Sequence, residues 1–253
     1  VYTTIAGLVT FPWNFKIAFG ALNDCRPILG YRRKSWMVVG WTMCALMCFV
    51  ISVMPLPDPY WCKSESGHYI TTCSHAGDAA RSSAYAKACG AIPAADFGDG
   101  AVAAAPCSEA TQTMAGKYAG LLAVAATGYV IADVAADGLT VQYAQREPEA
   151  KRGKVQSTAY LVRACGFISS RLLVGFGMNT PEYSGTFKAG LGFRGVVAIF
   201  GCISCAMAPV SWLYVREEKV RAPALRAYFA GVWRLMSGSA FFAAFIFSIG
   251  YPA

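Results

Sequence analysis

The chain of 253 residues is 56% hydrophobic and only 14% charged, with a mean hydropathy of +0.42 and a formal net charge of +8. An ordinary soluble domain carries roughly 25% charged residues, so this composition indicates a membrane protein. The positive charge does not indicate nucleic-acid binding, because the basic residues gather in short clusters at the edges of hydrophobic stretches.

Apolar stretches of about 20 residues, the length that crosses the hydrocarbon core as a helix, recur along the chain. Six of them in series cannot all be core helices of one small domain. They are 1–22, 35–55, 117–141, 156–177, 193–215 and the beginning of another from 237. The sequence therefore predicts an all-α, polytopic membrane helix bundle with about five full spans and the start of a sixth. Both ends fall within apolar runs, so we expect the chain to be a fragment of a longer protein.

The basic residues also predict the orientation of the spans. Thirteen of the 22 Lys and Arg residues lie in the alternate loops 23–34, 145–155 and 216–236, whereas the longer loop 56–116 carries only three. Short loops rich in Lys and Arg stay in the cytoplasm. We therefore expect these three loops inside and the loop 56–116 outside.

The first cytoplasmic loop combines an acid, Asp24, with Gly30 and the basic triplet 32–34. A loop of this kind between membrane helices is typical of solute carriers, and its triplet cannot cross a bilayer cheaply. The alternative is an ordinary basic loop of any multispan protein.

The outer loop 56–116 contains four cysteines, and the outer face of a membrane is oxidising. We expect two disulfides, and the sequence cannot choose among the three possible pairings. Zinc bound with the help of His68 and His75 is the alternative, but spacings of 11, 16 and 18 residues contain no C-x-x-C knuckle, so no metal site is predicted. The four cysteines are Cys62, Cys73, Cys89 and Cys107.

The last basic loop, 216–236, repeats apolar residues at steps of three and four. This spacing predicts an amphipathic helix that lies on the inner leaflet. A calmodulin-type target helix would look similar, and we favour a connecting linker.

Charged residues within the predicted spans are costly and mark either a pathway or a pairing. Asp133 and Asp137 lie four residues apart on one helical face. At 1.5 Å per residue, Asp137 and Arg163 both lie roughly 10 Å from the cytoplasmic ends of their helices, so they can pair. Arg171, roughly 22 Å deep, has no acid at its level and is free to meet an anionic ligand or an acid from elsewhere. Lys16 either binds a ligand or extends to the inner surface.

Two alternatives accompany these charges. Asp133, Asp137 and Arg163 could form a network that only locks the helices together. An enzyme is not expected, because an intramembrane aspartyl protease needs its two aspartates on different helices. An alcohol phosphotransferase would need further aspartates on the helix after Asp137, and Arg163 lies there instead. No cofactor is predicted.

Four segments resemble a known family. They are Pro12-Trp13-Asn14-Phe15-Lys16, the loop 20–34, Ala132-Asp133-Val134-Ala135-Ala136-Asp137-Gly138 and Arg146-Glu147-Pro148. Together they resemble the folate-biopterin transporter family of the major facilitator superfamily. The loop departs from the general superfamily pattern in two ways: five residues separate Asp24 from Gly30, and Tyr31 precedes Arg32. Both features are similar to the longer form in this branch.

The resemblance implies helices two to six of a twelve-helix carrier in 1–215, a cytoplasmic linker in 216–236 and the start of helix seven in 237–253. The partners would be the missing carboxy-terminal half, the lipid bilayer and a folate, pterin or similar metabolite. The expected location is the plasma membrane, with an organelle membrane as the alternative.

The resemblance also implies roles for individual residues. Asp24, Arg32 and Arg33 would form an inner gate that holds one state of a proton-coupled carrier working by alternating access. Asp133 would be protonated, and Arg171, with Lys16, would face the substrate carboxylates. The alternative in another class is a non-transporting membrane receptor or scaffold on the same fold.

Overall fold

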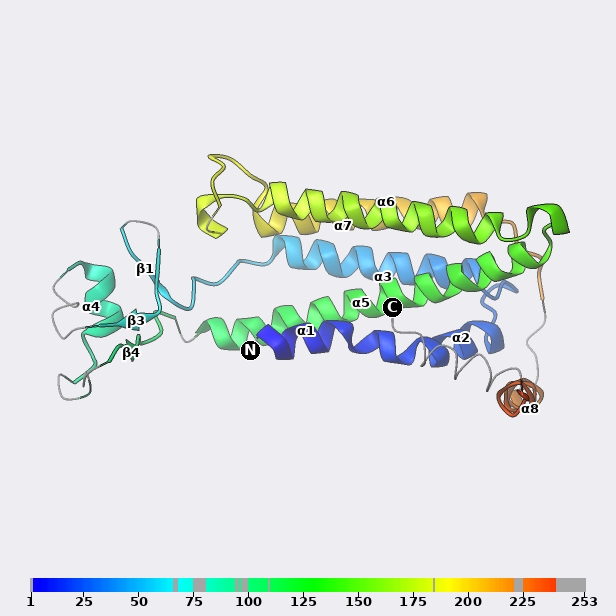
Figure 1. The fold of residues 1–253 in the computed structure, drawn as a ribbon, viewed down its shortest axis with the longest axis horizontal. Coiled ribbons are helices and arrows are strands. Elements are labelled where there is room, and N and C mark those ends of the chain that lie inside the picture. Colours follow the sequence, from blue (N-terminus) through cyan, green and yellow to red (C-terminus); the bar gives the residue numbers. More distant parts are fainter. Residues whose placement is uncertain are drawn as a thin grey trace.

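The protein is a bundle of long helices with a small lobe at one end and a crosswise helix at the other (Figure 1). The computed structural model describes residues 2–65, 68–74, 81–93, 96, 100–108, 110–183, 185–220 and 225–239. The helices of the bundle are α1 (Tyr2–Thr10), η1 (Phe11–Phe15), α2 (Lys16–Cys25), α3 (Lys34–Val53), α5 (Ala110–Gln145), α6 (Lys154–Gly177) and α7 (Gly192–Tyr214).

Five segments of the described chain are long and apolar enough to cross a membrane, which confirms the five complete spans expected from the sequence. They are Thr3–Cys25, Lys34–Val53, Thr113–Gln145, Glu149–Gly177 and Gly192–Tyr214. The protein is thus an all-α membrane helix bundle. The sixth expected span lies outside the described residues, except for 237–239.

The first span is not one continuous α-helix. It contains a turn of 3-10 helix, η1, with Pro12 in its first turn. Proline has no backbone N–H and clashes with the preceding turn, so the α-helical hydrogen bonds are interrupted here. The interruption makes Lys16 the first residue of α2.

Helix α3 lies between α5 and α7, and its packing on α5 depends on two glycines. A Cβ atom on Gly40 would lie 2.5 Å from the carbonyl oxygen of Gly128, and one on Gly128 would lie 2.7 Å from that of Gly40. The two backbones are therefore in direct contact. Gly116, Gly120 and Gly128 have the small-residue spacing that permits close helix contact. Gly128 is at this contact, whereas a Cβ on Gly116 or Gly120 meets nothing within 4 Å among the described residues.

The lobe contains two small antiparallel sheets and a short helix, which extend away from the bundle (Figure 1). These elements are β1 (Cys62–Lys63), β2 (Tyr69–Ile70), β3 (Thr72–Cys73), β4 (Val102–Ala103) and α4 (Ser83–Cys89). Strand β1 pairs with β2, and β3 pairs with β4.

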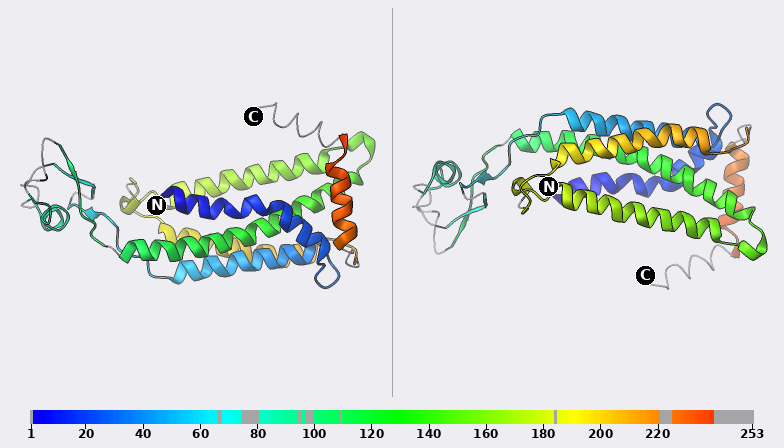
Figure 2. Two further views of the ribbon diagram at one scale, coloured as in Figure 1. Left: turned by 90° about the horizontal axis from the view of Figure 1, so that it is seen from below. Right: turned by 90° about the horizontal axis from the view of Figure 1, so that it is seen from above.

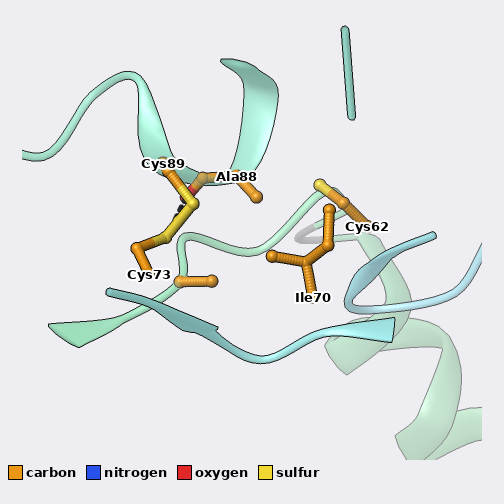
Figure 3. Close-up of a cluster of buried hydrophobic side chains, with 6 residues drawn as sticks. Cys62, Ile70, Cys73, Ala88 and Cys89 are labelled. Atoms are coloured by element: carbon orange, nitrogen blue, oxygen red, sulfur yellow. Dashed lines mark hydrogen bonds between the residues drawn. A yellow bond between two sulfur atoms is a disulfide. The ribbon is translucent and has the colours of Figure 1, made fainter. Parts of the chain in front are cut away.

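Two disulfides stabilise the lobe, as the number of cysteines predicted. The bonds join Cys62 to Cys107 and Cys73 to Cys89. Figure 3 shows the second bond beside Ala88, within a small buried cluster that includes Ile70. Because all four sulfurs are in disulfides, they are not available as zinc ligands. His68 is exposed, and His75 lies outside the described residues.

The amphipathic helix expected in the loop 216–236 is present as α8 (Leu225–Met236). It occupies the later part of that loop. Residues 216–220 are instead held without helical structure by the first loop, whose Gly30 carbonyl accepts a 2.8 Å hydrogen bond from the amide of Val220. Figure 2 shows α8 running across the ends of the spanning helices.

The glycine contact between α3 and α5 predicts the effect of adding one methyl group. Gly40→Ala should destabilise the bundle by about 1–3 kcal/mol, because the added Cβ forces two backbones apart. Gly120→Ala is the matched control on α5, where the same atom enters open space. Thermal unfolding of the detergent-solubilised protein measures both, and equal melting temperatures would contradict the close contact.

Candidate functional site

Four charged side chains from three helices meet inside the bundle. Asp133 and Asp137 come from α5, Lys16 from α2 and Arg163 from α6. Lys16 Nζ lies 2.8 Å from Asp133 Oδ2 and 3.1 Å from Asp137 Oδ2. Arg163 Nη2 lies 2.9 Å from Asp133 Oδ1 and 2.6 Å from Asp137 Oδ1. The Asp137–Arg163 pair expected from their equal depth is thus confirmed. We call these four residues the charge cluster.

The sequence creates this geometry in two places. One helical turn separates Asp133 from Asp137, so both carboxylates leave α5 on the same side. The η1 turn ends just before Lys16, whose ammonium lies 4.7 Å from the centre of the Trp13 ring. Lys16 therefore does not extend to the inner surface, since it bonds to both carboxylates. The two cations and two carboxylates make the cluster electrically neutral.

The two carboxylates differ in their exposure. The Asp133 side chain is 6% exposed, whereas that of Asp137 is 44% exposed. Buried charges need close partners to offset the loss of water. Asp133 is accordingly the inner anchor of the cluster, and Asp137 is the member that solvent and solutes reach.

Two adjoining cavities border the cluster between α5 and α6, and Asp137 and Arg163 line both of them. The larger, of about 960 Å³, has mainly apolar walls that include Trp41, Tyr129 and Phe167. The smaller, of about 710 Å³, lies toward the ends of the helices that carry the basic loops. Its polar lining residues are Thr140, Gln145, Arg152, Gln156 and Tyr160.

The aromatic wall was not predicted from the sequence. Tyr129 lies between two indoles, with its ring centre 5.9 Å from that of Trp13 and 6.0 Å from that of Trp41. The sequence could have indicated Tyr129, because it lies four residues before Asp133 and residues at this spacing share a helix face. Trp41 gave no such signal, since it comes from α3.

Arg171 does not join the cluster. Its side chain is exposed on α6, it lines neither cavity, and no ion pair involving it occurs in the described part of the chain. Its expected contact with a substrate carboxylate has no support from this geometry.

At the basic-loop end of the bundle, the structure brings together two of the residues expected to form a gate. Arg33 Nη2 lies 3.3 Å from Asp24 Oδ1, and Arg33 also donates a hydrogen bond to the carbonyl of Gly138. Arg33 thus connects Asp24, near the end of α2, to Gly138 of α5, which is the residue after Asp137. Arg32 does not take part: its Nε atom is buried, with no hydrogen-bond partner among the described residues.

Gly30 has a role in the turn of this loop. Its φ of +84° lies in the left-handed region, which glycine enters without a steric penalty. The turn allows the amides of Ile28 and Tyr31 to bond to each other's carbonyls at 3.0 Å.

Glu217 is a functional candidate that the sequence did not single out. Its carboxylate accepts hydrogen bonds from the amides of Arg32 and Arg33 at 3.2 Å and of Lys34 at 2.8 Å. These amides open α3, where backbone donors have no helical partner and the helix dipole favours a negative charge. Glu217 therefore fastens the segment after α7 to the first loop.

The Tyr228 side chain of α8 lies near Asp24. Burial, and then the charge of Asp24, raise the pKa of the Tyr228 phenol above its usual value. The phenol therefore stays protonated at neutral pH and presents a donor group to the carboxylate.

Comparisons of the chain with protein-family models, with curated proteins and with solved structures found no match. The features of the chain that bear on its function are therefore the charge cluster, the cavities beside it and the contacts of the basic loops.

The unequal burial of the two aspartates predicts unequal effects of neutralising them. Asp133→Asn should lower the free energy of unfolding by about 3 kcal/mol, the lower end for a broken buried pair, because Lys16 and Arg163 are partly exposed and keep Asp137 as a partner. Asp137→Asn should cost less, because Asp137 is half exposed. Adding Lys16→Met to Asp133→Asn removes one cation and should restore part of the loss. Thermal unfolding and folded yield measure all three, and an equal loss in the two single variants would contradict the assignment of Asp133 as anchor.

The carboxylate of Glu217 should protect three backbone amides. Glu217→Ala should speed hydrogen exchange at Arg32, Arg33 and Lys34, because their acceptor is removed. Glu218→Ala is the matched control, since Glu218 is the exposed neighbour of Glu217 in the chain. Exchange measured by mass spectrometry on the peptide that covers the loop should change only in the first variant. If the loop exchanges at the same rate in both variants, Glu217 does not protect these amides.

Proposed function

We propose that the chain belongs to a secondary active transporter of the major-facilitator type, which moves a small metabolite by alternating access and couples this movement to protons. The observation that carries the proposal is a neutral cluster of four charges within the spans, beside two cavities. Ionisable residues inside a helix bundle are costly, and those that face a cavity mark a path for ions or substrate. The lining of both cavities by Asp137 and Arg163 supports such a path.

The charge balance of the cluster suggests how coupling works. An anionic solute meets no free cation there, because Lys16 and Arg163 are neutralised by the two carboxylates. Protonation of Asp137 removes one negative charge and leaves the cluster with a net charge of +1, so a carboxylate of the solute can replace Asp137 as the partner of Arg163. Loss of the proton restores the ion pair and expels the solute. One proton thus accompanies one anionic group.

This mechanism assigns the proton to Asp137 rather than Asp133, the residue that the resemblance suggested. Asp133 is buried between two cations, whereas Asp137 borders both cavities. Proton uptake requires a route from water, and Asp137 has the greater exposure. Asp133 would then hold Lys16 and Arg163 in place through both protonation states.

The substrate we propose is a folate, a pterin or a related metabolite. The resemblance of the sequence to folate-biopterin transporters suggests this class, and two features of the larger cavity agree with it. Its aromatic wall suits a planar heterocycle, since aromatic rings stack favourably face to face with an offset. Arg163 suits a carboxylate. The plasma membrane is the proposed location, and the carboxy-terminal half of the carrier is the proposed partner.

The gate residues fit the same proposal. Arg33 joins Asp24 to the carbonyl of Gly138, and Glu217 ties the segment after α7 to the loop. Carriers of this type rock two halves about a central site, so contacts at one end must break during the cycle. These polar contacts would hold the state in which that end is closed.

Uptake into proteoliposomes tests the proposal. With full-length protein, a gradient of one pH unit and no membrane potential, one-to-one coupling should accumulate a labelled folate or pterin about tenfold. Asp137→Asn should abolish accumulation but retain exchange of substrate across the membrane, because an amide does not titrate. Asp58→Asn is the control, since Asp58 is exposed in the outer loop.

The possible outcomes separate the alternatives. Accumulation by Asp137→Asn at the wild-type level would remove this residue from coupling. Binding of a pterin or folate without flux, in wild-type protein that is folded, would favour a receptor on the same fold. Flux of other anionic metabolites only would retain the transporter and reject the substrate class.

A further inference from the structure

Helix α8 exposes a surface of mixed apolar and basic character. Its largest apolar side chains are open to the surroundings, with Trp233 73%, Leu235 75% and Phe229 57% exposed. Its charged residues are Arg226 and Arg234, both exposed, and the helix contains no acid. At 100° per residue, Arg226 lies beside Trp233 on the helical wheel, at the edge of the apolar face.

Helix α8 lies beside the end of α2. Tyr228 is near Asp24, and Phe229 borders a groove whose other walls include Leu22 and Cys25. The first span ends at Cys25, so these contacts hold α8 level with the edge of the spanning region. The helix crosses the spans instead of continuing them (Figure 2). A helix in this position lies in the plane of the membrane interface.

We propose that α8 is a binding surface for anionic lipid headgroups of the inner leaflet. Trp233, Leu235 and Phe229 enter the boundary between headgroups and acyl chains, while Arg226 and Arg234 bind lipid phosphates and carboxylates. Charge complementarity favours this occupant: the two exposed arginines of α8, a helix with no acid of its own, attract the negative surface of the cytoplasmic leaflet. Arginine also forms forked hydrogen bonds with phosphate. The proposal does not depend on the transport function.

The surface lies next to the gate, so its occupancy has a structural consequence. Lipid bound along α8 holds the helix beside α2 and keeps Tyr228 near Asp24, the carboxylate that pairs with Arg33. The lipid site and the gate thus share one residue.

Photo-crosslinking of the full-length protein in nanodiscs tests the proposal. A benzophenone amino acid placed at Trp233 should cross-link to lipid, with a preference for phosphatidylserine over phosphatidylcholine in mixed discs. Each arginine is expected to contribute about fivefold to this preference. Arg226→Gln with Arg234→Gln should therefore abolish the preference, and high salt should weaken it.

Two controls define the comparison. A benzophenone at Leu46, exposed within the spanning helix α3, should cross-link to lipid without preference for the anionic one. Lys188→Gln removes an exposed positive charge from the loop before α7 and should leave the preference at Trp233 unchanged.

Two results would overturn the proposal. One is cross-linking of position 233 to protein rather than lipid, which would show that another polypeptide segment covers α8. The other is equal labelling of the two lipids by the wild-type sequence. If the double arginine variant does not fold, the comparison of the two lipids within mixed discs still decides between these outcomes.

Discussion

The arrangement of the bundle around its candidate site depends on one interaction, the sharing of Asp133 between cations from two other helices. Its carboxylate lies 2.8 Å from Lys16 and 2.9 Å from Arg163, and it is almost completely buried. No residue in the most apolar segment of α6 is buried. Apolar packing therefore holds this helix only weakly. The ion pairs of Arg163 therefore fix the distance between α6 and α5, and with it the shape of both cavities.

Helices α3, α5 and α7 are packed more tightly than α6, and the reason is steric. Gly40 and Gly128 bring the backbones of α3 and α5 into contact, and α3 also packs along α7. This unit positions Asp133 and Asp137 on one side and the start of the basic loop at its end. Polar contacts from Glu217 and Arg33 then close that end. The tightly packed helices α3, α5 and α7 and the weakly packed α6 meet at the charge cluster. A transport cycle would need movement at this boundary.

Much of this fold could be predicted from local sequence. The five spans follow from length and hydropathy, the number of disulfides from four cysteines in one loop, and the Asp137–Arg163 pair from equal depth in consecutive helices. Contacts between distant segments could not be predicted. Lys16 lies 121 residues from Asp137, and nothing in its surroundings specifies a helix with two acids as its neighbour. Glu217 and the pairing of the cysteines were missed for the same reason. Of the small residues at 116, 120 and 128, only Gly128 contacts another helix among the described residues, because spacing shows which face they share but not whether a helix lies there.

The neutrality of the charge cluster has an electrical consequence. Moving one elementary charge through the full membrane potential changes its energy by about 2.3 kcal/mol per 100 mV. Two cations and two carboxylates that move together carry no net charge through that field. If one proton enters with one anionic group, the occupied cluster is neutral as well. Reorientation of these four residues would therefore do no electrical work, whether the site is empty or filled, and its rate would not depend on the membrane voltage.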